Sequence, residues 1–198
     1  AKGYTTYTCS LCGKSYHGNF VEKTAHNYVS GTCTVCKASE SGLPGNGDKV
    51  SILGYGCMRW PMIKNEEDKD IVDQEAVNRL VDYAIEHGVN YFDTAPVYLQ
   101  GQSESATGIA LKRHPRQKYF IATKLSNMRD HTFEGAVSMY KRSLENLQTE
   151  YIDYYLLHSV SNGEVFKKRF IDNGVLEYML NERKEGRIRN LGLSFHGN

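Results

Sequence analysis

Four polar side chains lie where apolar stretches of the chain end, and their types suit carbonyl chemistry. Asp93, Lys124 and His158 each directly follow a stretch that reads as a buried strand, and Tyr98 lies five residues past Asp93. An ammonium beside a phenol stabilises the phenolate, and an aspartate paired with the lysine keeps that ammonium charged and in place. The phenol can then act as a general acid near neutral pH, while a histidine that donates a hydrogen bond orients and polarises a substrate carbonyl. Each residue alone has an ordinary structural explanation, so the prediction depends on their coincidence.

The elements that position these residues alternate between strands and helices from about residue 48 onward. Hydrophobic periodicity and turn residues predict five strands and four helices. The predicted strands are 50–54, 89–92, 118–123, 151–157 and 188–193, and the predicted helices are 70–86, 103–114, 132–147 and 174–184. Crossovers of this length allow parallel pairing, which places the carboxyl ends of all strands at one edge of the sheet. The fold class is therefore α/β, and both a doubly wound sheet and part of a (β/α)8 barrel fit.

Composition excludes several function classes. The 198-residue chain is 40% hydrophobic and 24% charged, as expected of a globular protein. Its net charge of +1 argues against nucleic acid as a partner that is bound by bulk electrostatics. No apolar run approaches the ~18 residues of a transmembrane helix, so no membrane association is predicted. A cytoplasmic location is expected, because the strand-end lysine and a free Cys57 need no oxidising compartment.

Longer motifs around the strand ends resemble the aldo-keto reductase family over residues 48–198. GVNYFDTAPVY, with Glu104 and Gly108, resembles the family's Asp-Thr-Ala, Tyr, Glu and Gly signature, and VSILGYGCMRWP resembles its first strand and loop. IATKL, YIDYYLLHS and KEGRIRNLGLS resemble the strand ends that carry Lys, His and Ser, and GLSFH is closest to an anaerobe-type, iron–sulfur-associated branch. The resemblance implies a TIM barrel, of which this chain holds about five βα units.

The resemblance also implies a reaction and a coenzyme. The family tetrad maps onto Asp93, Tyr98, Lys124 and His158, with NADPH (or NADH) as hydride donor and a small aldehyde or ketone as acceptor. In this scheme Tyr98 donates the proton, Lys124 tunes it, Asp93 holds the lysine and His158 orients the carbonyl.

Coenzyme contacts are implied at the first and fifth strands. Gly56, Cys57 and Met58 fall where the family's backbone lies near the nicotinamide ribose, and Cys57 itself is expected to be a buried structural thiol. Ser194 matches the serine that contacts the nicotinamide carboxamide, but Phe195 replaces the asparagine that usually follows it. A full barrel needs ~250 residues. We therefore expect this chain to be a C-terminally incomplete fragment with little or no reductase activity.

Four cysteines form a separate module at residues 1–40, joined to the barrel region by a linker at 41–47. Cys9, Cys12, Cys33 and Cys36 have the spacing C-x2-C-x20-C-x2-C, which is typical of a tetrahedral four-thiolate metal site. Zinc is the expected metal in this small ribbon. Iron in a rubredoxin-like site, disulfides and free thiols remain the alternatives.

Two other functions compete with the reductase hypothesis. One is a Schiff-base barrel enzyme in which Lys124 attacks the substrate carbonyl. The other is an interaction module, in which the ribbon docks a partner and the barrel fragment is inert.

Overall fold

The computed structural model describes residues 5–8, 15–18, 28–29, 32–33 and 47–197. The chain divides into two compact units, Ala1–Ile52 and Leu53–Asn198. Within the first unit, β1 (Thr5–Thr8) pairs antiparallel with β2 (Ser15–Gly18), and β3 (Tyr28–Val29) pairs antiparallel with β4 (Thr32–Cys33). Cys9, Cys12 and Cys36 lie outside the described residues, and of Cys33 only the backbone is described. The metal ribbon therefore stays a prediction.

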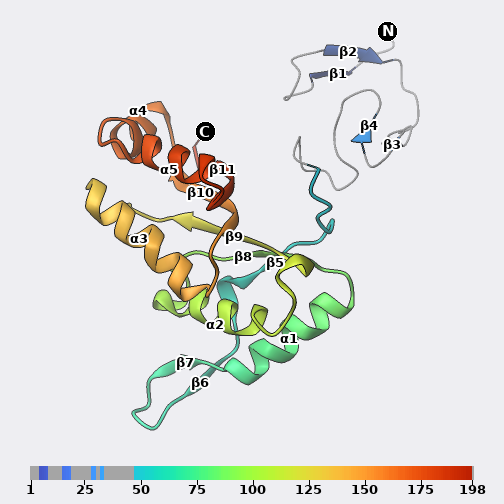
Figure 1. Cartoon of the computed structure of the whole chain (residues 1–198), viewed down its shortest axis with the longest axis vertical. Coiled ribbons are helices and arrows are strands. Elements are labelled where there is room, and N and C mark those ends of the chain that lie inside the picture. The colour runs from blue at the N-terminus through green and yellow to red at the C-terminus, as the bar shows by residue number, and fades with distance from the viewer. Residues whose placement is uncertain (1–4, 9–14, 19–27, 30–31, 34–46, 198) are drawn as a thin grey trace. The chain divides into compact units, whose positions relative to one another are not determined.

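The second unit is built on a parallel sheet of five strands (Figure 1). These strands are β5 (Tyr55–Gly56), β8 (Tyr91–Asp93), β9 (Phe120–Leu125), β10 (Ile152–Val160) and β11 (Ile188–Phe195). They pair in the order in which they occur in the sequence, without a reversal. A doubly wound sheet has a point at which the strand order reverses. The consecutive order therefore identifies the sheet as part of an α/β barrel and excludes the doubly wound alternative.

Helices follow one another along the sheet in the same consecutive order (Figure 1). Helix α1 packs on α2, α2 on α3, and α3 on α5. Their bounds are α1 (Gln74–Glu86), α2 (Gln102–Leu111), α3 (Phe133–Asn146) and α5 (Val175–Lys184). Shorter turns are η1 (Cys57–Arg59), η2 (Tyr98–Gly101), η3 (Arg116–Lys118), α4 (Gly163–Phe166) and a π-helical turn, η4 (Lys167–Ile171). The helices and the sheet bury two apolar clusters, one around α1 and α2 and one around α3 and α5.

Side chains alternate between the two faces of the sheet. Phe92 and Ile121 belong to the apolar cluster beneath the helices. Tyr91 and Tyr154 lie on the other face, with ring centroids 5.3 Å apart. Because side chains alternate with a period of two, Asp93 shares the face of Tyr91. The polar strand ends therefore lie on the face turned away from the helices.

The register is staggered from strand to strand. Asp93 pairs with Ala122, so Lys124 extends two residues beyond it. Lys124 in turn pairs with Leu156, so His158 extends two residues further. Such a stagger arises when strands tilt around a barrel axis, and it carries the polar residues along a slanted line at the carboxyl edge.

A cluster of ion pairs lies at the opposite edge of the sheet, where the strands begin. The Asp153 carboxylate, which is 1% exposed, pairs with Arg116 and with Arg189. The same carboxylate accepts the Ile121 amide at 2.9 Å, which ties the start of β10 to β9. A buried carboxylate with two guanidinium partners and an amide donor has its charge compensated.

Two predicted boundaries differ most from the structure. Residues 50–54 form no strand, since only Tyr55 and Gly56 find a partner in β8. The first helix begins at Gln74 rather than Asp70, because Asp73 accepts the Ala76 amide as the N-cap. Residues Asp70–Val72 instead form β7, an antiparallel hairpin with β6 (Met62–Lys64).

Candidate active site

Lys124 is held at the carboxyl end of β9 by two oxygen atoms. Its Nζ donates to Asp93 Oδ1 at 2.6 Å and to the carbonyl oxygen of Thr94 at 2.7 Å. The Lys124 side chain is 7% exposed and that of Asp93 is 33% exposed. A largely buried ammonium is tolerated where a carboxylate and a carbonyl replace its water. The contact joins the ends of β8 and β9.

The Tyr98 ring lies over this ammonium. Lys124 Nζ is 4.8 Å from the centroid of the Tyr98 ring. The turn that carries Tyr98 has an unusual backbone, because Leu99 and Gln100 both adopt left-handed φ angles, of 50° and 57°. This conformation is disfavoured for residues with a side chain and persists only where the surroundings hold it. The backbone is therefore strained directly after Tyr98, whose ring lies at the strand ends.

His158 completes the group from the end of β10. Its ring centroid lies 6.4 Å from that of Tyr98 in an edge-to-face arrangement. Burial, followed by the positive charge of Lys124, lowers the pKa of His158 to about 4. The imidazole is therefore neutral near pH 7, with one ring proton to donate.

The amino end of α2 supports the loop after β8. The Ser103 hydroxyl donates to the Cys57 carbonyl at 2.7 Å and lies 2.9 Å from Thr94 Oγ1. The Thr94 amide donates to the Ala122 carbonyl at 2.8 Å. These bonds orient the Thr94 carbonyl that Lys124 uses.

Glu104 lies behind the site in the core. It is fully buried and accepts the Thr123 hydroxyl at 2.7 Å and the Asn146 amide group at 3.3 Å. Burial raises the pKa of Glu104, and these hydrogen bonds offset part of the effect. Glu104 thus links α2 to α3 and to β9, where its partner Thr123 directly precedes Lys124. It does not reach the polar face.

The residues predicted to contact a coenzyme are accessible to different degrees. A side chain at Gly56 would meet nothing within 4 Å, so its backbone faces open space. Met58 is exposed, whereas the Cys57 thiol is fully buried and its pKa is raised to about 12 by burial. Cys57 therefore offers only its backbone. Ser194 Oγ accepts the Ser159 amide at 2.9 Å, which leaves the hydroxyl proton free to donate to a carboxamide. The open backbone at Gly56 and the available Ser194 proton are compatible with the predicted coenzyme contacts.

Two residues of the site were missed in the sequence. Ser126 Oγ lies 2.6 Å from His158 Nδ1, and the Thr94 carbonyl binds Lys124. Ser126 had a detectable signal, because it follows Lys124 by two residues and therefore shares its face of an extended strand. The Thr94 carbonyl could not be predicted, because every residue has a backbone carbonyl and the residue type does not show which one is used.

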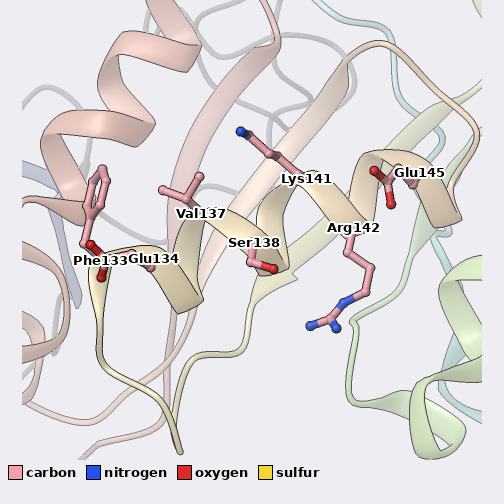
Figure 2. A pocket seen from close by; sticks show the side chains of 7 residues that line it. All are labelled: Phe133, Glu134, Val137, Ser138, Lys141, Arg142 and Glu145. Atoms are coloured by element: carbon pink, nitrogen blue, oxygen red, sulfur yellow. The ribbon is translucent and has the colours of Figure 1, made fainter.

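A hollow of about 540 Å³ lies elsewhere, along the outer face of α3 (Figure 2). Its lining side chains, among them Phe133, Val137, Lys141 and Arg142, all come from this one helix. Polar groups that act on a ligand usually converge from several elements. The strand ends remain the candidate active site.

The part of the chain that the structure describes contains no group of three or more His, Cys, Asp or Glu side chains arranged to hold a metal ion. Within the same part, no helix is long and apolar enough to cross a bilayer.

A consecutive parallel sheet with polar groups at its carboxyl edge defines a chain of the (β/α)8-barrel class. The model of the Aldo/keto reductase family matches residues 53–197. This chain belongs to that family. Its sequence is 34% identical over 157 residues to "Probable aldo-keto reductase 1" of Glycine max, a match that covers 75% of this chain and 42% of the relative.

Solved structures agree with this membership. The holo form of aldo-keto reductase AKR11C1 from Bacillus halodurans superposes with a TM-score of 0.59 at 32% identity, over 75% of this chain and 47% of that one. An aldo-keto reductase from Klebsiella pneumoniae in complex with NADPH gives a TM-score of 0.54 at 27% identity, over 73% and 45% of the two chains. This chain therefore spans about half the length of the proteins it matches. The anaerobe-type branch is not among the features that these matches establish.

Proposed function

We propose that this chain carries the proton-donor part of a carbonyl reductase site that uses NADPH or NADH and acts on a small aldehyde or ketone. The observation that carries the proposal is the Lys124 ammonium, bound to Asp93 and Thr94 and lying 4.8 Å from the Tyr98 ring centroid. When bound, the nicotinamide supplies the hydride that the carbonyl carbon accepts. All other steps fall to side chains of this chain.

Tyr98 is the proposed general acid. Its hydroxyl gives a proton to the carbonyl oxygen, and the Lys124 ammonium stabilises the phenolate that remains. Asp93 fixes the ammonium by a contact of 2.6 Å. His158 Nδ1 is engaged by Ser126, which leaves Nε2 to donate to the carbonyl oxygen and orient it.

Gly56, Met58 and Ser194 would hold the nicotinamide end of the coenzyme. The backbone at Gly56 is open, Met58 is exposed, and Ser194 retains a hydroxyl proton for the carboxamide. The NADPH complex of the Klebsiella pneumoniae relative favours NADPH over NADH as the first coenzyme to test.

The test is reduction of small aldehydes by the full 198-residue chain, followed by the loss of reduced-nicotinamide absorbance at high protein concentration. Tyr98→Phe should lower the rate by about 100-fold or more, because it removes the general acid. Tyr83→Phe is the matched control, since Tyr83 is 64% exposed on α1. Equal rates for wild type and Tyr98→Phe would refute the assignment. No rate above the uncatalysed reaction in the wild type would match the little or no activity expected of this chain and would refute a working reductase site in it.

The Schiff-base alternative makes a different prediction for Lys124. A lysine nucleophile must react as the neutral amine, whereas the Asp93 and Thr94 oxygens stabilise the ammonium of Lys124. Borohydride treatment in the presence of an aldehyde should therefore leave Lys124 unmodified. A mass increase on the peptide that contains Lys124 would favour the alternative.

We further propose that Cys9, Cys12, Cys33 and Cys36 bind one zinc ion, on the basis of their spacing alone. Elemental analysis of the purified chain tests this. One equivalent of zinc in a colourless protein supports the proposal, whereas iron with visible absorption or the absence of any metal refutes it.

A further inference from the structure

Ser126 and His158 form a close contact at the ends of neighbouring strands. Ser126 Oγ lies 2.6 Å from His158 Nδ1, and Ser126 is 5% exposed. The hydroxyl either donates to an unprotonated Nδ1 or accepts from a protonated one. Among the described residues, Ser126 Oγ has no other hydrogen-bond partner. A buried hydroxyl satisfies its proton only by donating it, so this bond favours an unprotonated Nδ1 and a proton on Nε2.

A buried arginine holds this contact together. Arg169 lies on η4 and is 4% exposed. Its Nη1 donates to the Ser159 carbonyl at 3.0 Å, and its Nη2 donates to Asn127 Oδ1 at 2.9 Å. Ser159 directly follows His158, and Asn127 directly follows Ser126. One guanidinium therefore joins the two segments that carry the contact.

Arg169 has no carboxylate partner among the described residues. A buried cation without an opposite charge is costly, so stability alone does not explain its position. Its Nε also lacks a hydrogen-bond partner within the described part of the chain. The geometry of its two Nη groups, one on each segment, is what the arginine contributes.

The backbone at Ser159 shows that this geometry is imposed. Ser159 has a left-handed φ of 56°, which residues with a side chain adopt only when their surroundings hold them there. Its carbonyl is bound by Arg169 and its amide by Ser194 Oγ at 2.9 Å. The pairing of β10 with β11 shifts register between Leu157 and Val160, across this residue. The orientation of His158 thus depends on the irregular backbone at Ser159, which Arg169 and Ser194 hold in place.

We propose that Ser126 and Arg169 are positioning residues for His158, which keep its imidazole in the tautomer that presents Nε2–H on the polar face. Ser126 sets the tautomer by donating to Nδ1, and Arg169 keeps the two segments in register. The inference deepens the proposed function, because it rests on His158 as the donor to a substrate carbonyl.

The charges around His158 agree with this role. Lys124 and Arg169 are cations near the ring, His196 lies 6.3 Å away between ring centroids, and Tyr98 faces it edge-on. Burial and then these positive groups lower the pKa of His158 to about 4. The imidazole is therefore neutral across the ordinary pH range, and its tautomer decides whether Nε2 can donate.

The tautomer can be measured without turnover. We suggest long-range proton–nitrogen correlation spectra of the full chain with 15N-labelled histidine, with the His158 signals assigned by their loss in His158→Asn. The wild type should show a protonated Nε2 and an unprotonated Nδ1 from about pH 6 to 8. In Ser126→Ala the ratio of Nε2–H to Nδ1–H should fall by about 5- to 10-fold, the effect of one lost hydrogen bond. The exposed Ser138→Ala is the matched control and should leave the spectrum unchanged.

Variants of Arg169 separate its charge from its geometry. Arg169→Lys keeps a cation but not the two-pronged bridge, so the tautomer ratio should fall while the pKa of His158 stays low. Arg169→Met should also shift that pKa upward, toward its ordinary value, whereas Arg142→Met on the outer face of α3 should change neither (Figure 2). If Arg169→Met fails to fold, Ser126→Ala and Arg169→Lys decide the question.

Two results would overturn the inference. One is a wild-type His158 that is protonated on Nδ1, and the other is a Ser126→Ala spectrum with an unchanged tautomer ratio. Failure of the proposed function is distinguishable, because absence of aldehyde reduction by the wild type would leave these spectra unaffected. Where reduction is measured, Ser126→Ala should lower kcat/KM by about 5- to 10-fold, in step with the tautomer ratio.

Discussion

Gly108 is the position at which one added methyl group should be most informative. It lies on α2, where that helix crosses the end of α3 and the residue that follows it. A Cβ at Gly108 would clash with the Asn146 carbonyl oxygen and would lie 2.7 Å from both Cα and the carbonyl carbon of Leu147. Nonbonded carbon atoms attract at about 3.5–4.0 Å. The methyl group would therefore overlap three backbone atoms by roughly 1 Å, and none of them can move by a side-chain rotation.

The expected magnitude follows from two opposing terms. Overpacking a tight core costs about 1–3 kcal/mol, and a clash with backbone belongs at the upper end of that range. Alanine recovers about 1 kcal/mol over glycine in a helix interior. Gly108→Ala should therefore lower the free energy of unfolding by about 2 kcal/mol.

Urea denaturation followed by circular dichroism measures this change. With a slope of about 2 kcal/mol per molar urea, the midpoint should fall by about 1 M. Gly163→Ala is the control, because a Cβ there meets nothing within 4 Å, so the midpoint should stay the same or rise by up to about 0.5 M. Gly108→Ala with the midpoint of the wild type would show that α2 does not approach the end of α3 this closely.

Three further predictions concern charge and strain near the site. Burial raises the pKa of Glu104 above its ordinary value of 4.5. The contribution of Glu104 to stability should therefore be greatest below pH 4.5 and decline as the pH rises through the folded-state pKa. The urea midpoints of Glu104→Gln should lack this decline. The pKa of His158 is lowered from 6.5 to about 4, so stability should be lost as the pH falls through that window, and His158→Asn should remove this loss. At Ser159, whose φ is 56°, replacement by valine should lower the free energy of unfolding by about 2 kcal/mol relative to replacement by glycine, because only glycine adopts this conformation freely. Midpoints that are equal for the two Ser159 variants would contradict the left-handed assignment.

Each parallel strand that was predicted with a long apolar run is present, while the short first strand was misplaced. The segments around Ile121 and Tyr155 contain enough apolar residues to be predicted as strands from the sequence. Residues 50–54 are equally apolar, but Ile52 and Leu53 are 99% and 69% exposed, and pairing begins only at Tyr55. Strand pairing depends on a partner that is distant in sequence, and a local pattern cannot supply it.

The start of the first helix shows a similar limit. Ile71 and Val72 fit a helical face, yet both are β-branched and pair in a hairpin with β6. The cap at Asp73 is a local signal, since its carboxylate bonds the Ala76 amide. Choosing between Asp70 and Asp73 required knowing that the hairpin forms.

The strand-end residues were accessible to sequence reasoning because topology alone brings parallel strand ends together. Their supports were less accessible. Ser126 could be found by its spacing from Lys124, but Arg169 reaches the site from a π-helical turn after β10. Neither that turn nor the left-handed backbone at Leu99 has a strong residue signature.

Strand β10 carries Asp153 near its start and His158 near its end, five residues and about 16 Å apart. The first anchors Arg116 and Arg189, and the second belongs to the polar edge. Mutational tolerance should therefore be graded along a single strand. One library would vary the loops beyond the carboxyl edge and keep Asp153 and its two arginines, and a second library of equal size would vary the opposite edge. The first library should contain a much higher frequency of folded members. New specificities would then be reachable through folded intermediates.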